Sequence, residues 1–151
     1  MQKPMVVRSG EAEALRVLGV DVRFVCPGEL TGKAFSLMEN VIPKEMGPPP
    51  HLHDWAEAYY VTAGAVQFEI AGEHVLLKAG DFAYTPAGTV HGFRGASEAP
   101  ARMLVFDAPA HAETFFREVD HEVKGPEDFA KVPSIGARNG IHFQAPHAAK
   151  A

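Results

Sequence analysis

The chain has 151 residues, of which 46% are hydrophobic and 22% are charged, a balance typical of folded globular proteins rather than disordered ones. Its net charge of −5 comes with lysines and arginines scattered along the chain, so we expect no nucleic-acid partner. No apolar run approaches the roughly 20 residues that a membrane-spanning helix needs, and the first residues lack the apolar core of a secretory signal. We therefore expect a cytoplasmic protein with one domain over residues 1–151 and no membrane contact.

Short β-rich runs alternate with glycine or proline between about residues 22 and 109, the pattern of an all-β sandwich or barrel. In Val66–Ile70 apolar and polar residues alternate strictly, which predicts one face toward the barrel interior and one toward water. The predicted strands are Val22–Cys26, Ala34–Ile42, Ala58–Thr62, Val66–Ile70, His74–Leu77, Phe82–Thr85, His91–Phe93 and Arg102–Phe106. Short strands in this number suit a jelly-roll barrel with its core at about residues 22–109.

The sequence changes to a helix-friendly composition after Pro109, which predicts a helical tail over about residues 110–145 that packs on the barrel. Short helices are predicted at His111–Val119 and at Pro126–Ala130, where the proline and the acidic residues after it suit a helix start. Residues 145–151 are expected to fray. Cys26 is the only cysteine, so no intrachain disulfide is expected to stabilise the fold.

The first motif with chemical content runs from His51 to Gly64 and has the form H-x-H-x3-E-x6-G. Side chains two residues apart on a strand project from the same face, about 6.5–7 Å apart along the chain, so His51 and His53 can converge on one point. Glu57 has the same parity, and a bend near Asp54 would bring its carboxylate toward the two imidazoles. Two nitrogens and one oxygen on one side of a coordination sphere favour a divalent transition metal.

The second motif runs from Gly80 to His91 and has the form G-x5-P-x-G-x2-H. Pro86 fixes its own φ and Gly88 accepts backbone conformations closed to other residues, so a tight turn is predicted just before His91. This histidine would then supply a third imidazole. Three imidazoles and one carboxylate suit one ion of Fe(II), Mn(II), Ni(II), Cu(II) or Zn(II), with one or two positions left for water or substrate.

Together the two motifs resemble the two signature motifs of the cupin superfamily, and the resemblance covers about residues 47–95. It implies a double-stranded β-helix, the jelly-roll cupin barrel, with short helices after it. The resemblance also implies that His51, His53, Glu57 and His91 hold the metal ion. The short segment between the motifs is similar to that of compact, single-domain microbial cupins of the cupin 2 conserved-barrel type.

The chain departs from the cupin pattern at two turn positions. Gly47 lies closer to His51 than the corresponding glycine of the family, and Gly95 stands where the family pattern has asparagine. Neither position is a metal ligand. We expect these departures to change the path of the local loops rather than the metal centre.

The resemblance is strongest to quercetin-dioxygenase-like cupins, which implies a dioxygenase-type oxidoreductase acting on a small flavonol, diketone or catechol-like substrate. In this interpretation Glu57 is also catalytic, because a carboxylate that leaves the metal can accept a substrate proton. The alternative is a non-oxidative isomerase, decarboxylase or lyase in which the ion acts as a Lewis acid. A third possibility is a non-catalytic cupin that binds a small ligand.

Aromatic residues supply the candidates for the substrate pocket. On strands, aromatic side chains usually fill the core, so we expect only a few of them to reach the cavity. The candidates are Trp55, Tyr59, Phe68 and Phe93, whereas Phe82, Tyr84 and Phe106 are expected in the core. The family resemblance also implies a homodimer in which exposed edge strands are paired or covered. Because imidazole must be neutral to bind a metal, we expect bound metal to be lost below about pH 6.

Overall fold

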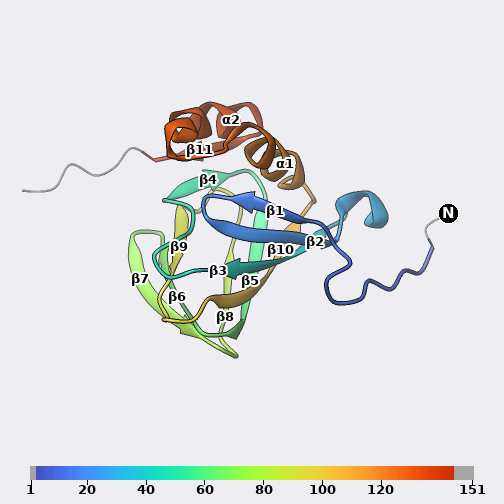
Figure 1. Ribbon diagram of the computed structural model, residues 1–151, viewed down its shortest axis with the longest axis horizontal. Helices are drawn as coiled ribbons and strands as arrows, with labels where there is room; N and C mark the ends of the chain where they lie inside the picture. Colours follow the sequence, from blue (N-terminus) through green and yellow to red (C-terminus); the bar gives the residue numbers. More distant parts are fainter. Residues whose placement is uncertain (1–2, 145–151) are drawn as a thin grey trace, which may run out of the picture.

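The computed structural model describes residues 3–144, whose strands form two antiparallel sheets that enclose a jelly-roll barrel (Figure 1). The first sheet has the order β1-β2-β3-β10-β5-β8, with β1 Ala14–Val17, β2 Val20–Cys26, β3 Ser36–Ile42, β10 Ala101–Ala108, β5 Ala56–Ala63 and β8 Phe82–Thr85. The second has the order β11-β4-β9-β6-β7, with β11 Ile141–Phe143, β4 His51–His53, β9 His91–Gly95, β6 Ala65–Ile70 and β7 Glu73–Lys78. The predicted all-β jelly roll is confirmed.

Each of the predicted strands is present, with ends shifted by no more than two residues. The alternation of side chains decides which face turns inward: in β3, Met38, Asn40 and Ile42 are buried, and the residues that alternate with them are only partly buried. Three strands were not predicted, namely β1, β4 and β11. Since β1 and the first residues of β2 belong to the first sheet, the barrel begins before residue 22.

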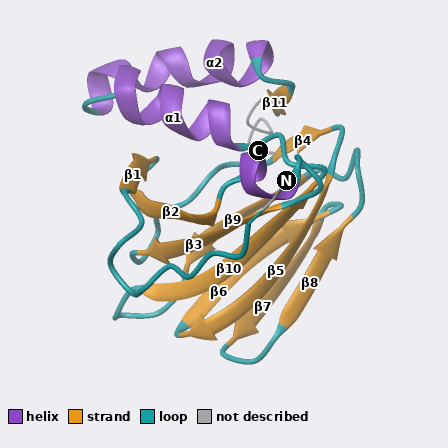
Figure 2. Ribbon diagram, turned by 90° about the vertical axis from the view of Figure 1, so that its right-hand side faces the viewer, coloured by secondary structure: helices purple, strands orange, loops and turns teal. Residues whose placement is uncertain are grey.

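The segment after the barrel lies across one of its ends (Figure 2). It contains helix α1 Glu113–Glu122, the 3₁₀ helix η2 Pro126–Lys131, helix α2 Val132–Arg138 and strand β11, while a short 3₁₀ helix, η1 Gly28–Thr31, follows β2. The first predicted helix is confirmed with shifted ends, and the second is a 3₁₀ helix that α2 continues. The predicted fraying of residues 145–151 lies outside the described residues. Between residues 3 and 144, no helix is both long and apolar enough to cross a membrane.

The core fills the space between the two sheets. Tyr59 and Phe68 are almost fully buried there, with ring centroids 5.1 Å apart in an edge-to-face arrangement. The prediction that Phe82, Tyr84 and Phe106 fill the core is wrong, because they are 61%, 56% and 39% exposed. In the edge strand β8, the small residues Ala83 and Thr85 face the interior instead, so the aromatic rings point outward. The homodimer stays a prediction.

A buried carboxylate joins helix α1 to the barrel. Asp107, near the end of β10, accepts hydrogen bonds from the backbone N–H groups of His111 and Ala112 at 2.8 and 2.9 Å. Its other oxygen accepts a hydrogen bond from the hydroxyl of Ser36 on β3. These contacts fix the start of the helix relative to two strands. On the inner face of α1, Phe115 and Val119 are buried.

The two glycines that depart from the cupin pattern lie where the loop 43–50 crosses β9. A Cβ atom at Gly95 would lie 2.2 Å from the carbonyl oxygen of Pro43. At Gly47, where φ is +143°, a Cβ atom would lie 2.2 Å from the carbonyl oxygen of Phe93. A side chain at either position would therefore collide with backbone atoms. The asparagine that the family pattern has at position 95 does not fit there for this reason.

Candidate metal centre

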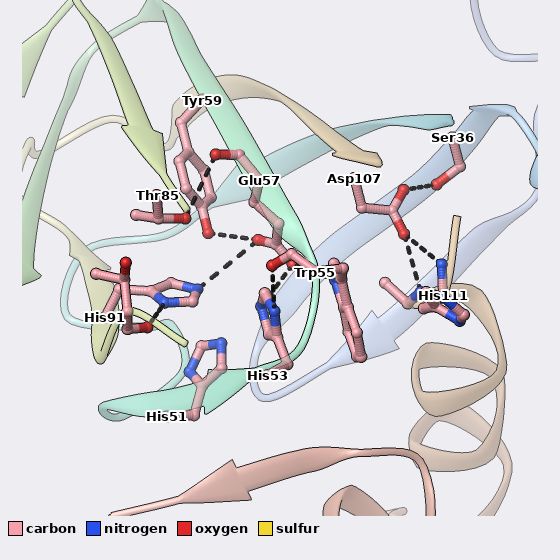
Figure 3. A network of polar contacts seen from close by, with 12 residues as sticks. Ser36, His51, His53, Trp55, Glu57, Tyr59, Thr85, His91, Asp107 and His111 are labelled. Carbon is pink, nitrogen blue, oxygen red and sulfur yellow. Dashed lines mark hydrogen bonds and ion pairs between the residues drawn. The ribbon is translucent and has the colours of Figure 1, made fainter. Parts of the chain in front are cut away.

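Three histidines meet inside the barrel at the end covered by the C-terminal segment (Figure 3). His51 and His53 face inward from β4, and His91 faces them from β9, where it is the register partner of His51. The ring centroids are 5.7 Å apart for His51 and His53, 4.4 Å for His51 and His91, and 4.9 Å for His53 and His91. One ring nitrogen from each histidine lies within 4.8 Å of the others, so the three can bind a single ion.

Each imidazole is oriented by a hydrogen bond to backbone close to it in the chain. The Nδ1 atoms of His51, His53 and His91 lie 3.0, 2.9 and 2.7 Å from a carbonyl oxygen two residues away. A carbonyl oxygen only accepts, so each Nδ1 carries the proton and donates it. The Nε2 atoms are then left with free lone pairs, which is the tautomer that metal-binding histidines use.

The Nε2 atoms of His53 and His91 indicate that the centre binds a cation. The Nε2 atoms of His53 and His91 are buried and have no hydrogen-bond partner among residues 3–144. His53 Nε2 lies 2.9 Å from Glu57 Oε1, and His91 Nε2 lies 3.9 Å from Glu57 Oε2. With Nδ1 protonated, a nitrogen lone pair faces a carboxylate lone pair, and such a contact needs a shared proton or a cation. The donor set therefore fits a divalent transition metal.

Glu57, on β5, is held beside the imidazoles by two aromatic residues. Trp55 Nε1 donates to Oε1 at 3.2 Å, and the Tyr59 hydroxyl donates to Oε2. Burial raises the pKa of Glu57, but in acid, once His53 and His91 carry an added proton, a hydrogen bond from His53 and the charges of both rings outweigh burial and lower the pKa to about 2. Glu57 is therefore a carboxylate. It borders the three-histidine cluster, and its role as a fourth ligand stays a prediction.

Burial keeps the imidazoles of His51 and His91 neutral. Burial, with a smaller contribution from the charge of His91, lowers the pKa of His51 from 6.5 to about 4. Burial also lowers the pKa of His91, against the opposing effect of Glu57. At neutral pH both rings are thus in the form that binds a metal, and protons compete for His51 only in more acidic solution than we expected from sequence.

The centre opens into a small cavity between the sheets and the C-terminal segment. The space open to the centre of a water molecule is about 50 Å³, which is room for about three or four waters. Of the side chains predicted for a pocket, Tyr59 and Phe93 line this cavity. Trp55 and Phe68 do not line it: Trp55 stacks on His53 with ring centroids 4.1 Å apart, and Phe68 packs in the core.

Sequence reasoning missed two parts of the cavity wall. The first is the cover formed by Phe115 and Phe116 on α1 and Phe143 on β11, with Phe143 5.5 Å from His51 between ring centroids. No local signal could have placed these aromatic residues over the site. The second is Asn40 on β3, a polar residue at an inward position of an apolar strand face, which was a visible signal.

Comparisons with known proteins agree with this architecture. A family model for the cupin domain matches residues 37–107. Quercetin 2,3-dioxygenase from Bacillus subtilis (strain 168) is 29% identical over 123 residues, which are 81% of this chain and 36% of that protein. The chain thus spans about a third of the length of this relative.

Solved structures of similar fold carry several different names. A polyketide cyclase from Streptomyces resistomycificus has a TM-score of 0.64 at 22% identity, with 70% of this chain and 80% of that chain covered. A predicted oxalate decarboxylase from Thermotoga maritima has a TM-score of 0.63 at 25% identity, with 70% and 99% covered.

The barrel, the two motifs and these matches identify residues 37–107 as a domain of the cupin superfamily. The matched segment contains all three histidines and Glu57, so the candidate metal centre lies within this domain. The names of the similar proteins include a dioxygenase, a decarboxylase and a cyclase. Family membership therefore leaves the type of reaction open.

Proposed function

We propose that this chain is a metal-dependent oxidoreductase of the dioxygenase type that acts on a small enol, diketone or catechol-like compound. The observation that carries the proposal is a cluster of three imidazoles beside one carboxylate, of which His51, His53 and Glu57 line an otherwise largely apolar cavity. A bound divalent ion would supply Lewis acidity there and, if it is redox-active, a route for electrons to O2. The similarity to quercetin 2,3-dioxygenase supports the proposal.

The protein's own side chains have distinct tasks in this proposal. His51, His53 and His91 hold the ion through their Nε2 atoms. Glu57 stays charged because Trp55 and Tyr59 donate hydrogen bonds to its two oxygens. As a fixed carboxylate next to the centre, it can complete the ligand set or accept the hydroxyl proton of the substrate. The apolar wall and the cover from α1 and β11 keep bulk water away from the reacting groups.

Cavity size and charge narrow the substrate class. The cavity has room for about three or four waters, which is close to the size of a short diketone or a single ring, whereas the three rings of a flavonol exceed it. None of the described residues that line the cavity is lysine or arginine. A dicarboxylate such as oxalate would therefore find no basic side chain to pair with, and a substrate with little charge suits the cavity better.

The test begins with elemental analysis of protein purified without chelator or nickel column. Metal-free protein is then loaded separately with Fe(II), Mn(II), Ni(II), Cu(II) and Zn(II), and oxygen uptake is measured with acetylacetone, catechol and the flavonol quercetin. We expect uptake with the two small compounds, in step with their consumption, and none in a His91→Ala variant. If every metal-loaded form leaves oxygen unconsumed with all three compounds, the dioxygenase proposal is wrong.

A second candidate is the non-oxidative isomerase, decarboxylase or lyase. The Tyr59–Glu57 hydrogen bond favours it, because Tyr59 fixes a buried carboxylate that can take a proton from one atom of the substrate and return it to another without help from O2. Substrate conversion that persists without oxygen and with redox-inert Zn(II) would select this candidate. Tight binding of a small compound with no conversion under either condition would instead select a ligand-binding cupin.

A further inference from the structure

Asn40 is the one amide side chain among the described residues that line the cavity of the metal centre. It lies on β3 and is only 3% exposed. Its Oδ1 atom is buried and has no hydrogen-bond partner within residues 3–144. A buried acceptor without a partner costs folding free energy, so this side chain needs an explanation that the fold itself does not supply.

The surroundings of Asn40 offer no structural reason for an amide. Along β3, its inward neighbours are Met38 and Ile42, and its register partners are Val22 on β2 and Met103 on β10. All four are buried apolar residues. A leucine of similar size would satisfy this environment better than asparagine does. Polar residues that weaken the core in this way are typical of functional sites.

We propose that Asn40 binds the end of the ligand that points away from the metal centre, and so selects the ligand. The inference rests on the proposed function, because the metal centre must hold the other end. The ligand class is a small, mostly apolar ring or chain with a metal-binding oxygen at one end and a hydroxyl or amide donor at the other. A ligand without this donor leaves Oδ1 unpaired and binds more weakly.

The strand order supports a ligand of this length. β10 lies between β3 and β5, so the strand of Asn40 is two interstrand spacings, roughly 10 Å, from the strand of Glu57. Asn40 is level with Met103 and Val61, so it is also offset from Glu57 by four residues, roughly 13 Å, along the strands. The cavity is lined by apolar side chains from both sheets, such as Val105 on β10 and Phe93 on β9. The side chains of Asn40 and Glu57 both extend inward and shorten this separation, which leaves a gap of the order of one substituted ring with metal-binding oxygens at one end and a hydroxyl at the other. Asn40 thus adds one polar contact to a wall that is otherwise apolar on that side.

A matched pair of probes tests the contact. Kojic acid and allomaltol share the same metal-chelating hydroxy-ketone ring, and they differ only in a hydroxyl group at the opposite end, which allomaltol lacks. Their affinities for Zn(II)-loaded protein are measured by titration calorimetry, with metal content determined for every sample. The variants are Asn40→Leu and Asn40→Ala, and Ile42→Val serves as a control at a buried residue on the same face of the same strand that does not line the cavity.

We expect the wild type to bind kojic acid about five- to tenfold more tightly than allomaltol. In Asn40→Leu and Asn40→Ala the ratio falls to about one, whereas Ile42→Val keeps it. Metal content is unchanged in all variants. In metal-free protein, Asn40→Leu raises the melting temperature by about 2–4 °C, because the unpaired amide is gone. A purely structural role for Asn40 would lower the melting temperature instead.

Three results would overturn the inference. These are a wild type with no preference for kojic acid, a preference that survives in both Asn40 variants, and metal-loaded protein that binds neither probe. A stability loss in Asn40→Leu together with an unchanged probe ratio would assign the residue to the fold. If elemental analysis finds that the wild type binds no metal, the proposed function itself is wrong. This result is distinguishable from a failure of the Asn40 inference, in which the protein binds metal but shows no Asn40-dependent preference.

Discussion

Acidification should lower the free energy of unfolding of the metal-free protein, because His51 is buried as a neutral imidazole. The pKa of this imidazole is 6.5 in an unfolded chain and about 4 in the fold, because burial opposes the charge. The unfolded state therefore takes up a proton as the pH falls below 6.5, while the folded state stays neutral until about pH 4. Each pKa unit corresponds to about 1.4 kcal/mol, so the free energy of unfolding loses about 3 kcal/mol over this range. That is a large part of the stability of an ordinary domain.

The loss can be measured by urea unfolding between pH 7.5 and pH 4.5, followed by the fluorescence of Trp55, the only tryptophan. A His51→Gln variant lacks the titrating ring, so its free energy of unfolding should fall by about 2 kcal/mol less than that of the wild type over this range. His74→Gln, at an exposed position on β7, is the matched control and should behave as the wild type does. Parallel curves for the wild type and His51→Gln would refute the reasoning. Glu57, whose pKa falls from 4.5 to about 2, adds a further loss only below pH 4.5.

Four further predictions concern the metal centre, the loop crossing, the helix cover and the assembly. His91→Ala removes one of three imidazole ligands, so elemental analysis should find far less than one equivalent of metal, and a full equivalent would contradict the assignment. Gly95→Asn places side-chain atoms against the Pro43 carbonyl and should cost about 1–3 kcal/mol, whereas an unchanged thermal midpoint would exclude the collision. Asp107→Ala leaves two backbone N–H groups of the α1 start unpaired and should cost about 2 kcal/mol in urea unfolding, with no loss counting against the capping role. Sedimentation equilibrium should give twice the chain mass of 16.3 kDa for the predicted homodimer, and a monomer at micromolar concentration would contradict it.

The barrel strands could be predicted from sequence because glycine and proline mark their ends and their side chains alternate. The elements that were missed are short or atypical. β4 and β11 have three residues each, and they form because they pair with each other, as Ile141 does with His53. α2 is only seven residues long and contains Gly136, which lowers helix propensity, and it is stabilised by the burial of Ile135. Only the folded chain supplies these contacts.

The metal centre was predictable for a different reason. Its histidines belong to two motifs whose spacing is local, so residue number alone indicates which side chains share a face. The cavity wall is not local: Phe143 reaches His51 only because β11 pairs with β4. The presence of an aromatic residue on a strand does not indicate whether its ring faces the cavity. The sequence therefore could not distinguish Phe93, which lines the cavity, from Phe68, which does not. Asn40 stood at an inward position of a predicted strand, and its polarity there was the clue.

The hydrogen bonds from the three Nδ1 atoms to carbonyl oxygens two residues away have a practical consequence for engineering. Since each ring takes its orientation from its own stretch of chain, the opposite wall can be varied without disturbing the ligands. Saturation libraries at Val22, Met38 and Phe116 would therefore sample new specificities on an intact centre. The same scaffold can in this way be retargeted by changing a few apolar side chains.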